Sequence, residues 1–144
     1  MSLRTHVVFE ADFTEDGVWT QSGAVVQPSG LNIASTLTEM LIHKDFEVSK
    51  ATPIESYGWD FTVSRVVWFV LQCPGPWLLL SKNNGPLVRK LFDAKALAVT
   101  HRDVLEKLNA LLHQDSRFHD IRWFTREEYE KGKDSDRAMW RSEP

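Results

Sequence analysis

The sequence predicts an α+β domain in which helices cover a mostly antiparallel sheet of about five strands. Strand-like segments follow one another between residues 46 and 81, and those near 46–48 and 57–64 alternate between apolar and polar residues as half-buried strands do. Segments with the three- and four-residue apolar spacing of amphipathic helices stand before and after that run. Successive strands joined by tight turns are antiparallel, and such a run flanked by helices is typical of α+β folds.

Length and composition fit one folded unit. The chain has 144 residues, of which 42% are hydrophobic and 26% are charged, as is ordinary for a protein with a packed core. We expect a single domain over residues 1–131. Residues 132–144 are charged and lack periodicity, so we expect a flexible C-terminal tail there.

The segment "HVVFEADF" predicts a strand over residues 6–13. The residues expected on its buried side are Val7, Phe9, Ala11 and Phe13. An acidic turn, "TEDG", follows with Asp16-Gly17 at its end; we interpret it as a solvated hairpin tip rather than a calcium loop. Residues 18–28 fit a short strand or a loop.

The first helix is predicted near residues 29–44, with Ser29 as its N-cap. Its apolar face is formed by Ile33, Leu37, Met40 and Leu41. The next strands are predicted near residues 46–52, 56–64, 66–72 and 76–81, and residues 118–124 fit a further strand or an edge segment.

Two features of this strand run are unusual. The turn at Ser64-Arg65 lacks the Gly or Asn that tight hairpins prefer. The segment from Val66 to Leu71 is apolar at every position, so both of its faces must be covered, by helices or by another copy of the chain.

Two further helices are predicted near residues 86–97 and 101–114, with Pro86 in the first turn of one and the capping-box pair Thr100 and Asp103 at the start of the other. The apolar stripe of the later helix consists of Val104, Leu108, Leu111 and Leu112. A second capping box, "TREE" from Thr125 to Glu128, predicts a short helix.

Charge is unevenly distributed, and this bears on possible partners. Residues 1–72 hold 4 Lys/Arg against 9 Asp/Glu, a net −5, whereas residues 73–144 have a net +2. Between Glu47 and Gln72 the only basic residues are Lys50 and Arg65, too few for an aromatic platform that stacks nucleic-acid bases. We therefore expect no nucleic-acid partner, and the acidic half would suit a basic protein.

The sequence offers little for catalysis. His101 and Asp103 are more readily a capping turn with an exposed histidine than an acid–base pair. Cys73 ends an apolar strand and is expected to be an inert thiol. Glu55 and Asp60 would lie on opposite faces of a regular strand, which does not suit paired-carboxylate chemistry. We predict no catalytic residue, and the spacing of the histidines predicts no metal site and no cofactor.

Aromatic residues supply the candidate functional surface. Tyr and Trp are enriched where a surface is buried against a partner, although most of these rings are expected in the core. The candidate ligand or partner residues are Glu55, Tyr57, Trp59, Asp60, Trp68 and Trp77. We interpret the chain as a non-enzymatic interaction domain with an acidic, aromatic sheet surface; the alternative is a small-ligand binder or enzyme with a pocket lined by Tyr57, Trp59, Trp68 and Trp77.

Size, cysteine content and the lengths of the apolar runs bear on cellular context. Size and architecture suggest, by analogy alone, small bacterial proteins such as immunity proteins or chaperones. We expect this chain to bind another protein or a second copy of itself. One cysteine is compatible with a reducing compartment. The first 13 residues lack a signal-peptide apolar run, and no apolar run is long enough to span a bilayer. We therefore expect a cytoplasmic protein without a membrane partner.

Overall fold

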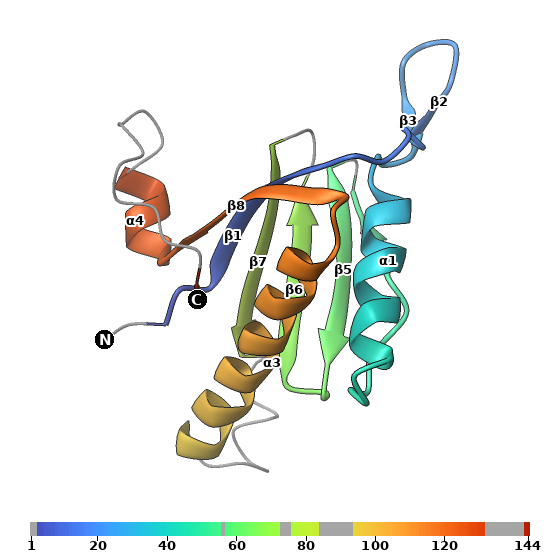
Figure 1. Cartoon of the computed structure of the whole chain (residues 1–144). Coiled ribbons are helices and arrows are strands. Elements are labelled where there is room, and N and C mark those ends of the chain that lie inside the picture. Colours follow the sequence, from blue (N-terminus) through green and yellow to red (C-terminus); the bar gives the residue numbers. More distant parts are fainter. Residues whose placement is uncertain (1–2, 56, 73–75, 84–93, 132–142) are drawn as a thin grey trace.

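The computed structural model describes residues 3–55, 57–72, 76–83, 94–131 and 143–144 (Figure 1). The strands of the large sheet are β1 (His6–Ala11), β4 (Thr52–Ile54), β5 (Gly58–Val63), β6 (Val67–Gln72), β7 (Trp77–Asn83) and β8 (Phe118–Phe124). A second sheet consists of β2 (Val18–Trp19) and β3 (Val25–Gln27). The helices in this part of the chain are α1 (Leu31–Ile42), α3 (Ala94–Gln114) and α4 (Arg126–Lys131). These elements confirm the predicted α+β class.

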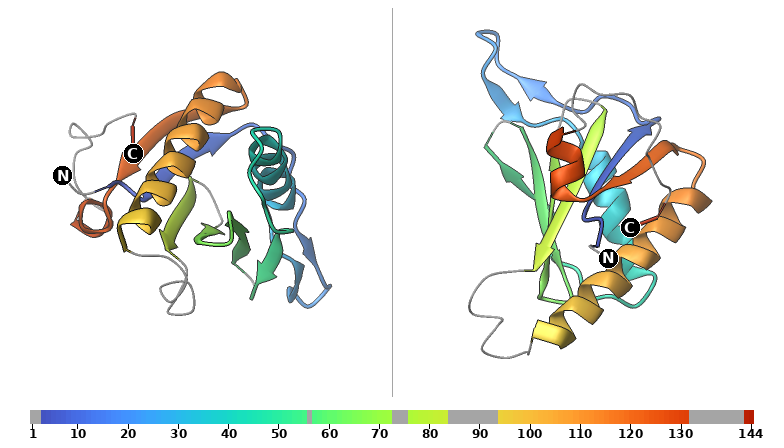
Figure 2. Two further views of the ribbon diagram at one scale, coloured as in Figure 1. Left: turned by 90° about the horizontal axis from the view of Figure 1, so that it is seen from below. Right: turned by 90° about the vertical axis from the view of Figure 1, so that its left-hand side faces the viewer.

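The large sheet is antiparallel at every pairing, in the order β4-β5-β6-β7-β1-β8. The N-terminal strand β1 therefore lies inside the sheet, between β7 and β8. Helices α1 and α3 both pack on one face of it (Figures 1 and 2). None of the described helices is long and apolar enough to cross a membrane.

The core lies between that face and the two helices. The predicted alternation of β5 is confirmed, because Trp59, Phe61 and Val63 are all buried while Asp60 and Thr62 are half-buried. Phe61 stacks on Phe69 of β6 with ring centroids 5.2 Å apart. The helices contribute Ile33, Leu37, Leu41, Leu97, Val104, Leu105, Leu108 and Leu112.

The second face of β6 carries Trp68, Val70 and Gln72. Val70 is only 4% exposed, so the prediction that this strand is covered on both sides is confirmed there. Trp68 is half-buried: its indole N–H donates to Asp60 Oδ2 at 3.1 Å, and Lys82 Nζ lies 4.6 Å from its ring centroid. The chain's own side chains therefore cover part of this face.

The C-terminal helical region differs from the prediction. Residues 94–114 form one continuous helix, so the prediction that a helix begins with a capping box at Thr100 and Asp103 is wrong. The helix continues because its buried stripe extends from Leu97 through His101 to Leu108, and burial of that stripe outweighs the local capping signal. The remainder of the helix predicted at 86–97, including Pro86, lies outside the described residues.

The strand predicted at 46–52 is also wrong in its bounds. Only an isolated bridge joins Val48 to Val63, and β4 begins at Thr52. This short strand contains Pro53, which lacks an N–H and is tolerated because β4 is an edge strand.

The β5–β6 turn forms without glycine. Ser64 and Arg65 adopt φ values of 55° and 63°, the positive angles that a type I′ turn requires. The Ser64 amide donates to the carbonyl of Glu47 at 2.7 Å, and Arg65 Nε lies 3.1 Å from Glu47 Oε1. Contacts with the preceding segment therefore support a conformation that these residue types rarely adopt.

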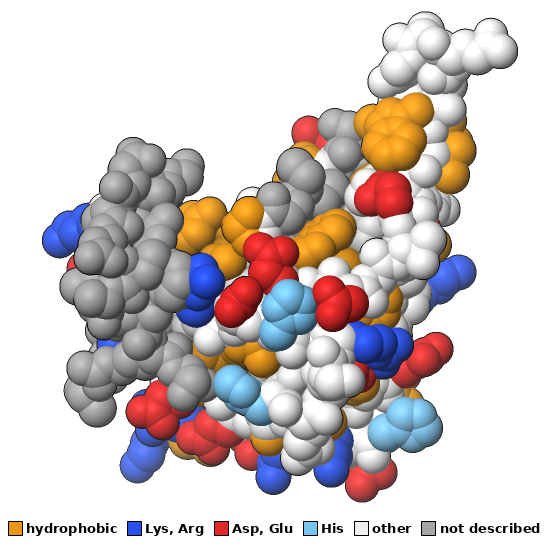
Figure 3. Space-filling model, turned by 45° about the horizontal axis from the view of Figure 1, so that its top comes forward, with side chains coloured by type: hydrophobic (Ala, Val, Ile, Leu, Met, Phe, Trp, Pro, Cys, Tyr) orange, Lys and Arg blue, Asp and Glu red, His pale blue; other side chains and the backbone are white. Residues whose placement is uncertain are grey.

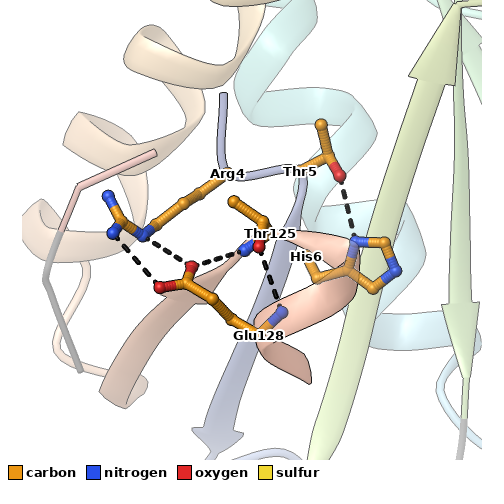
Figure 4. A network of polar contacts seen from close by, with 5 residues as sticks. All are labelled: Arg4, Thr5, His6, Thr125 and Glu128. Atoms are coloured by element: carbon orange, nitrogen blue, oxygen red, sulfur yellow. Dashed lines mark hydrogen bonds and ion pairs between the residues drawn. The ribbon is translucent and has the colours of Figure 1, made fainter. Parts of the chain in front are cut away.

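The second predicted capping box is confirmed and begins α4 (Figure 4). Glu128 N donates to Thr125 Oγ1 at 3.1 Å, and Thr125 N donates to Glu128 Oε1 at 2.8 Å. Arg4 Nε also donates to Glu128 Oε1 at 3.0 Å and so joins the N-terminus to α4. The Thr125 amide and then the Arg4 guanidinium hold the pKa of the Glu128 carboxyl below its usual value.

Candidate interaction site

Two of the predicted surface residues belong to the packed interior. Trp59 is buried, and its indole N–H donates to the carbonyl of Ser29 at 3.1 Å. Trp77 is half-buried beside Gly30, where an added β-carbon would lie 2.7 Å from its ring. Both rings therefore fix the start of α1 against the sheet.

The predicted aromatic pocket is not assembled. The register pairs Trp59 with Leu71 and Thr62 with Trp68, which places Trp59 and Trp68 on opposite faces of the sheet. Trp77 lies on the helix-covered face with Trp59, and Asp60 lies on the other face with Trp68. The sheet itself separates the residues that the sequence suggested would line one cavity.

The remaining two predicted residues lie in the β4–β5 turn. Tyr57 is exposed, and Glu55 is exposed with a φ of 46°. This turn is at the same end of the sheet as the start of α1, because Gly58 directly follows it and Trp59 reaches Ser29.

An apolar hairpin projects from that end of the molecule, and we call residues 18–27 the arm (Figure 1). Val18, Trp19 and Val26 are 46%, 51% and 65% exposed, so large apolar side chains face solvent on an element that extends beyond the core. No Asp, Glu, Lys, Arg or His occurs in residues 17–38, which include the whole arm. Exposed apolar groups gathered on one element mark interaction sites in soluble proteins.

The base of the arm is held to α1 by a network of hydrogen bonds. Asp16 accepts the amides of Gly30 and Asn32 at 2.9 and 2.8 Å, and thereby caps a helix whose N-cap residue, Gly30, supplies no side chain. Gln27 Nε2 donates to the Asp16 carbonyl at 2.7 Å. The predicted solvated tip at Asp16 and the predicted N-cap Ser29 are therefore both corrected: a carboxylate distant in sequence does the capping.

Acidic side chains lie on the same end of the molecule (Figure 3). Asp12 and Asp120 are exposed and flank His119, whose Nε2 lies 3.0 Å from Asp12 Oδ1 and whose Nδ1 lies 3.6 Å from Asp120 Oδ2. The hydrogen bond to Asp12, followed by the influence of Asp120, raises the pKa of this histidine. The arm therefore rises from a surface whose charge is mainly negative.

His101 and Asp103 do not form an acid–base pair, the alternative that the sequence disfavoured. His101 is buried and bonds to Ser81 on β7, whereas Asp103 is exposed on α3. The expectation of an exposed histidine is wrong because position 101 lies on the buried stripe of α3. Among the described residues, no cluster of His, Cys, Asp and Glu has the geometry to hold a metal ion. Cys73 lies outside those residues.

Sequence reasoning missed the arm. Its signal was present as two apolar pairs, Val18-Trp19 and Val25-Val26, separated by the polar run "TQSGA". A short two-stranded ribbon whose apolar side chains lie outside the core lacks the long alternation of a core strand, so the pattern was ambiguous.

Comparison of this chain with protein-family models, with curated proteins and with solved structures found no match in any of the three.

Proposed function

We propose that this chain is a non-enzymatic protein-interaction domain that contacts its partner through the arm. The observation that carries the proposal is the exposure of Val18, Trp19 and Val26 on one projecting hairpin. Tryptophan is one of the residue types enriched among those that dominate binding energy. Burying these side chains in a partner would recover the hydrophobic free energy that the isolated domain leaves in water.

Anchoring supports the same proposal. The Asp16 contacts fix the base of the arm to α1, so part of the ordering entropy that binding costs is already lost in the free protein. The partner in this proposal is a separate cytoplasmic protein. This chain would bind it as an immunity protein or a chaperone binds its target. Cytoplasmic location and this kind of partner remain predictions from the sequence.

The chain offers matched control positions for a test. Trp19 and Ile42 are both 51% exposed, and Val26 and Val99 are 65% and 63% exposed, with only the first of each pair on the arm. A photo-crosslinking amino acid at position 26 or 99 would be used in cells of the source organism to capture neighbours. Each protein that is captured from position 26 but not from position 99 would then be purified.

Binding of the purified candidate is measured by calorimetry. We expect Trp19→Ala to weaken binding about tenfold or more, and Ile42→Ala to leave it within about twofold. Capture of the same proteins from both positions, or equal affinities of the two alanine variants, would overturn the proposal. Sedimentation of the protein with phosphatidylcholine vesicles in a Trp19-dependent manner would instead identify a membrane-inserting arm and also reject it.

A further inference from the structure

We propose that Trp19 and Glu15 together bind a cationic side chain of the partner, best an arginine; this inference rests on the proposed function of the arm. Both residues are exposed and both border Gly17. A β-carbon added to Gly17 would lie 2.5 Å from Trp19 Cη2 and 2.6 Å from Glu15 Oε1. An indole ring and a carboxylate therefore share one small space at the base of the arm.

The carboxylate is positioned but retains acceptor capacity. Glu15 Oε1 accepts the Gly17 amide at 3.0 Å and the Ser29 hydroxyl, which orients the side chain. Its other oxygen, Oε2, has no hydrogen-bond or ion-pair partner among the residues the structure describes. An ionised carboxylate oxygen in this position favours a charged donor, since charge-assisted hydrogen bonds are the strongest available to it.

The indole ring of Trp19 is also available, in contrast to two half-buried aromatic rings elsewhere in the chain. Lys82 Nζ lies 4.6 Å from the Trp68 ring centroid, and Arg117 Cζ lies 4.8 Å from that of Phe13. Trp19 has no such cation within the described parts of the chain, although indole is the best ring for a cation–π contact. A guanidinium can stack on an aromatic face and donate in its own plane to a carboxylate, which is why arginine suits this pair.

The wider charge agrees with a basic partner. The segment from Gly17 to Thr38 contributes no positive charge that would compete for Glu15. Glu55, Asp12 and Asp120 are exposed at the same end of the sheet. A negative field there attracts a basic surface and accelerates its encounter.

The first test uses a defined probe. The Trp19 indole N–H signal of the whole protein is followed by NMR while acetyl-Gly-Arg-Gly-amide is added, with the citrulline peptide as the uncharged control. We expect a saturable shift with the arginine peptide alone, weakened by salt. Glu15→Gln should weaken it about threefold, the scale of an exposed cation–π or ion-pair contact. Glu39→Gln, an exposed carboxylate on α1, should leave it unchanged.

Equal shifts with the citrulline peptide, or equal affinities of the Glu15 and Glu39 variants, would overturn the inference. Measuring how the Trp19 and Glu15 variants bind the purified partner distinguishes failure of this inference from failure of the proposed function. If Trp19→Ala abolishes partner binding while Glu15→Gln and added salt do not change it, the arm is the interface but no cation is bound. If neither variant changes binding, the arm itself is rejected.

Discussion

The imidazole Nε2 of His101 on α3 lies 2.8 Å from the hydroxyl oxygen of Ser81 on β7, and both side chains are buried. The Ser81 hydroxyl also donates to the carbonyl of Thr5 at 3.3 Å. A neutral imidazole that donates from Nε2 satisfies both groups. This pair joins the longest helix to the centre of the sheet through a titratable residue, and it makes stability depend on pH.

Burial lowers the pKa of His101 to about 4, below its ordinary value of 6.5. Between these values the unfolded chain binds a proton that the folded chain does not, so the free energy of unfolding decreases as pH falls from 6.5 toward 4. The full loss is about 3 kcal/mol. Urea unfolding at pH 7 and pH 4.5 measures most of this loss, and His101→Asn should remove most of the difference between the two pH values.

Two other histidines influence the same measurement. Burial lowers the pKa of His6, so it adds a loss of the same sign, while the carboxylate of Asp12 raises the pKa of His119, which opposes it. The comparison between wild type and His101→Asn isolates the buried pair. An equal pH-dependent loss in both proteins would contradict the assignment.

Gly30→Ala should destabilise the protein more than Gly23→Ala. Both glycines have positive φ, 96° and 89°, so both substitutions carry similar backbone strain, on the order of 1 kcal/mol. Only at Gly30 would the new methyl group meet a ring, 2.7 Å from Trp77 Cζ3, whereas Gly23 has nothing within 4 Å. Thermal unfolding measures the difference, and equal midpoints would show that Trp77 moves aside freely.

Asp16→Ala should cost about 1–2 kcal/mol of stability, the usual value of an N-cap, because it leaves the amides of Gly30 and Asn32 without their acceptor. Asp103→Ala, an exposed carboxylate on α3, should change stability by less than about 0.5 kcal/mol. Chemical unfolding of both variants provides the comparison. Amide exchange at residues 30–34 should increase in the Asp16 variant alone.

Glu128→Gln should loosen α4. The uncharged amide weakens the contacts with the Thr125 amide and with Arg4, at 2.8 and 3.0 Å, that stabilise the ionised carboxylate. Amide exchange of Thr125 and Tyr129 should become faster, while Glu127→Gln, an exposed neighbour, should leave it unchanged. Because the pKa of Glu128 is lowered, its stabilising contribution is present above pH 4.5 and is lost as pH falls.

Much of the sheet could be predicted because local patterns report burial directly. The alternation at Trp59, Phe61 and Val63 indicated a one-sided strand, and the apolar run from Val66 to Leu71 indicated a central one. The capping box at Thr125 and Glu128 was readable because both of its partners lie within one turn. The similar pattern at Thr100 was misleading, since a capping box describes a local option that packing can override.

The candidate site was less predictable. The prediction that most of the aromatic residues near Trp59 belong to the core was correct for Trp59 itself. The predicted pocket combined Trp59 and Trp68, although their side chains point to opposite faces of the sheet. The arm was missed because its apolar residues pack on no core. The arm is a candidate site because its apolar side chains are exposed, and the order of residues in the sequence does not reveal exposure.

The sequence by itself determined which segments are amphipathic and therefore which faces of them are buried, because side-chain periodicity follows from backbone geometry alone. The same periodicity determined the α+β class, and the count of charged residues determined the acidic character of residues 1–72. The tertiary structure alone decided that Asp16 caps α1, that His101 meets Ser81, and that Trp19 and Glu15 share the space above Gly17. The His101 and Asp16 contacts join residues 20 and 14 positions apart. The Trp19 and Glu15 arrangement depends on how a short hairpin leaves the core. The long-range contacts and the Trp19–Glu15 arrangement are both set by how the elements pack against one another. No local sequence pattern specifies that packing.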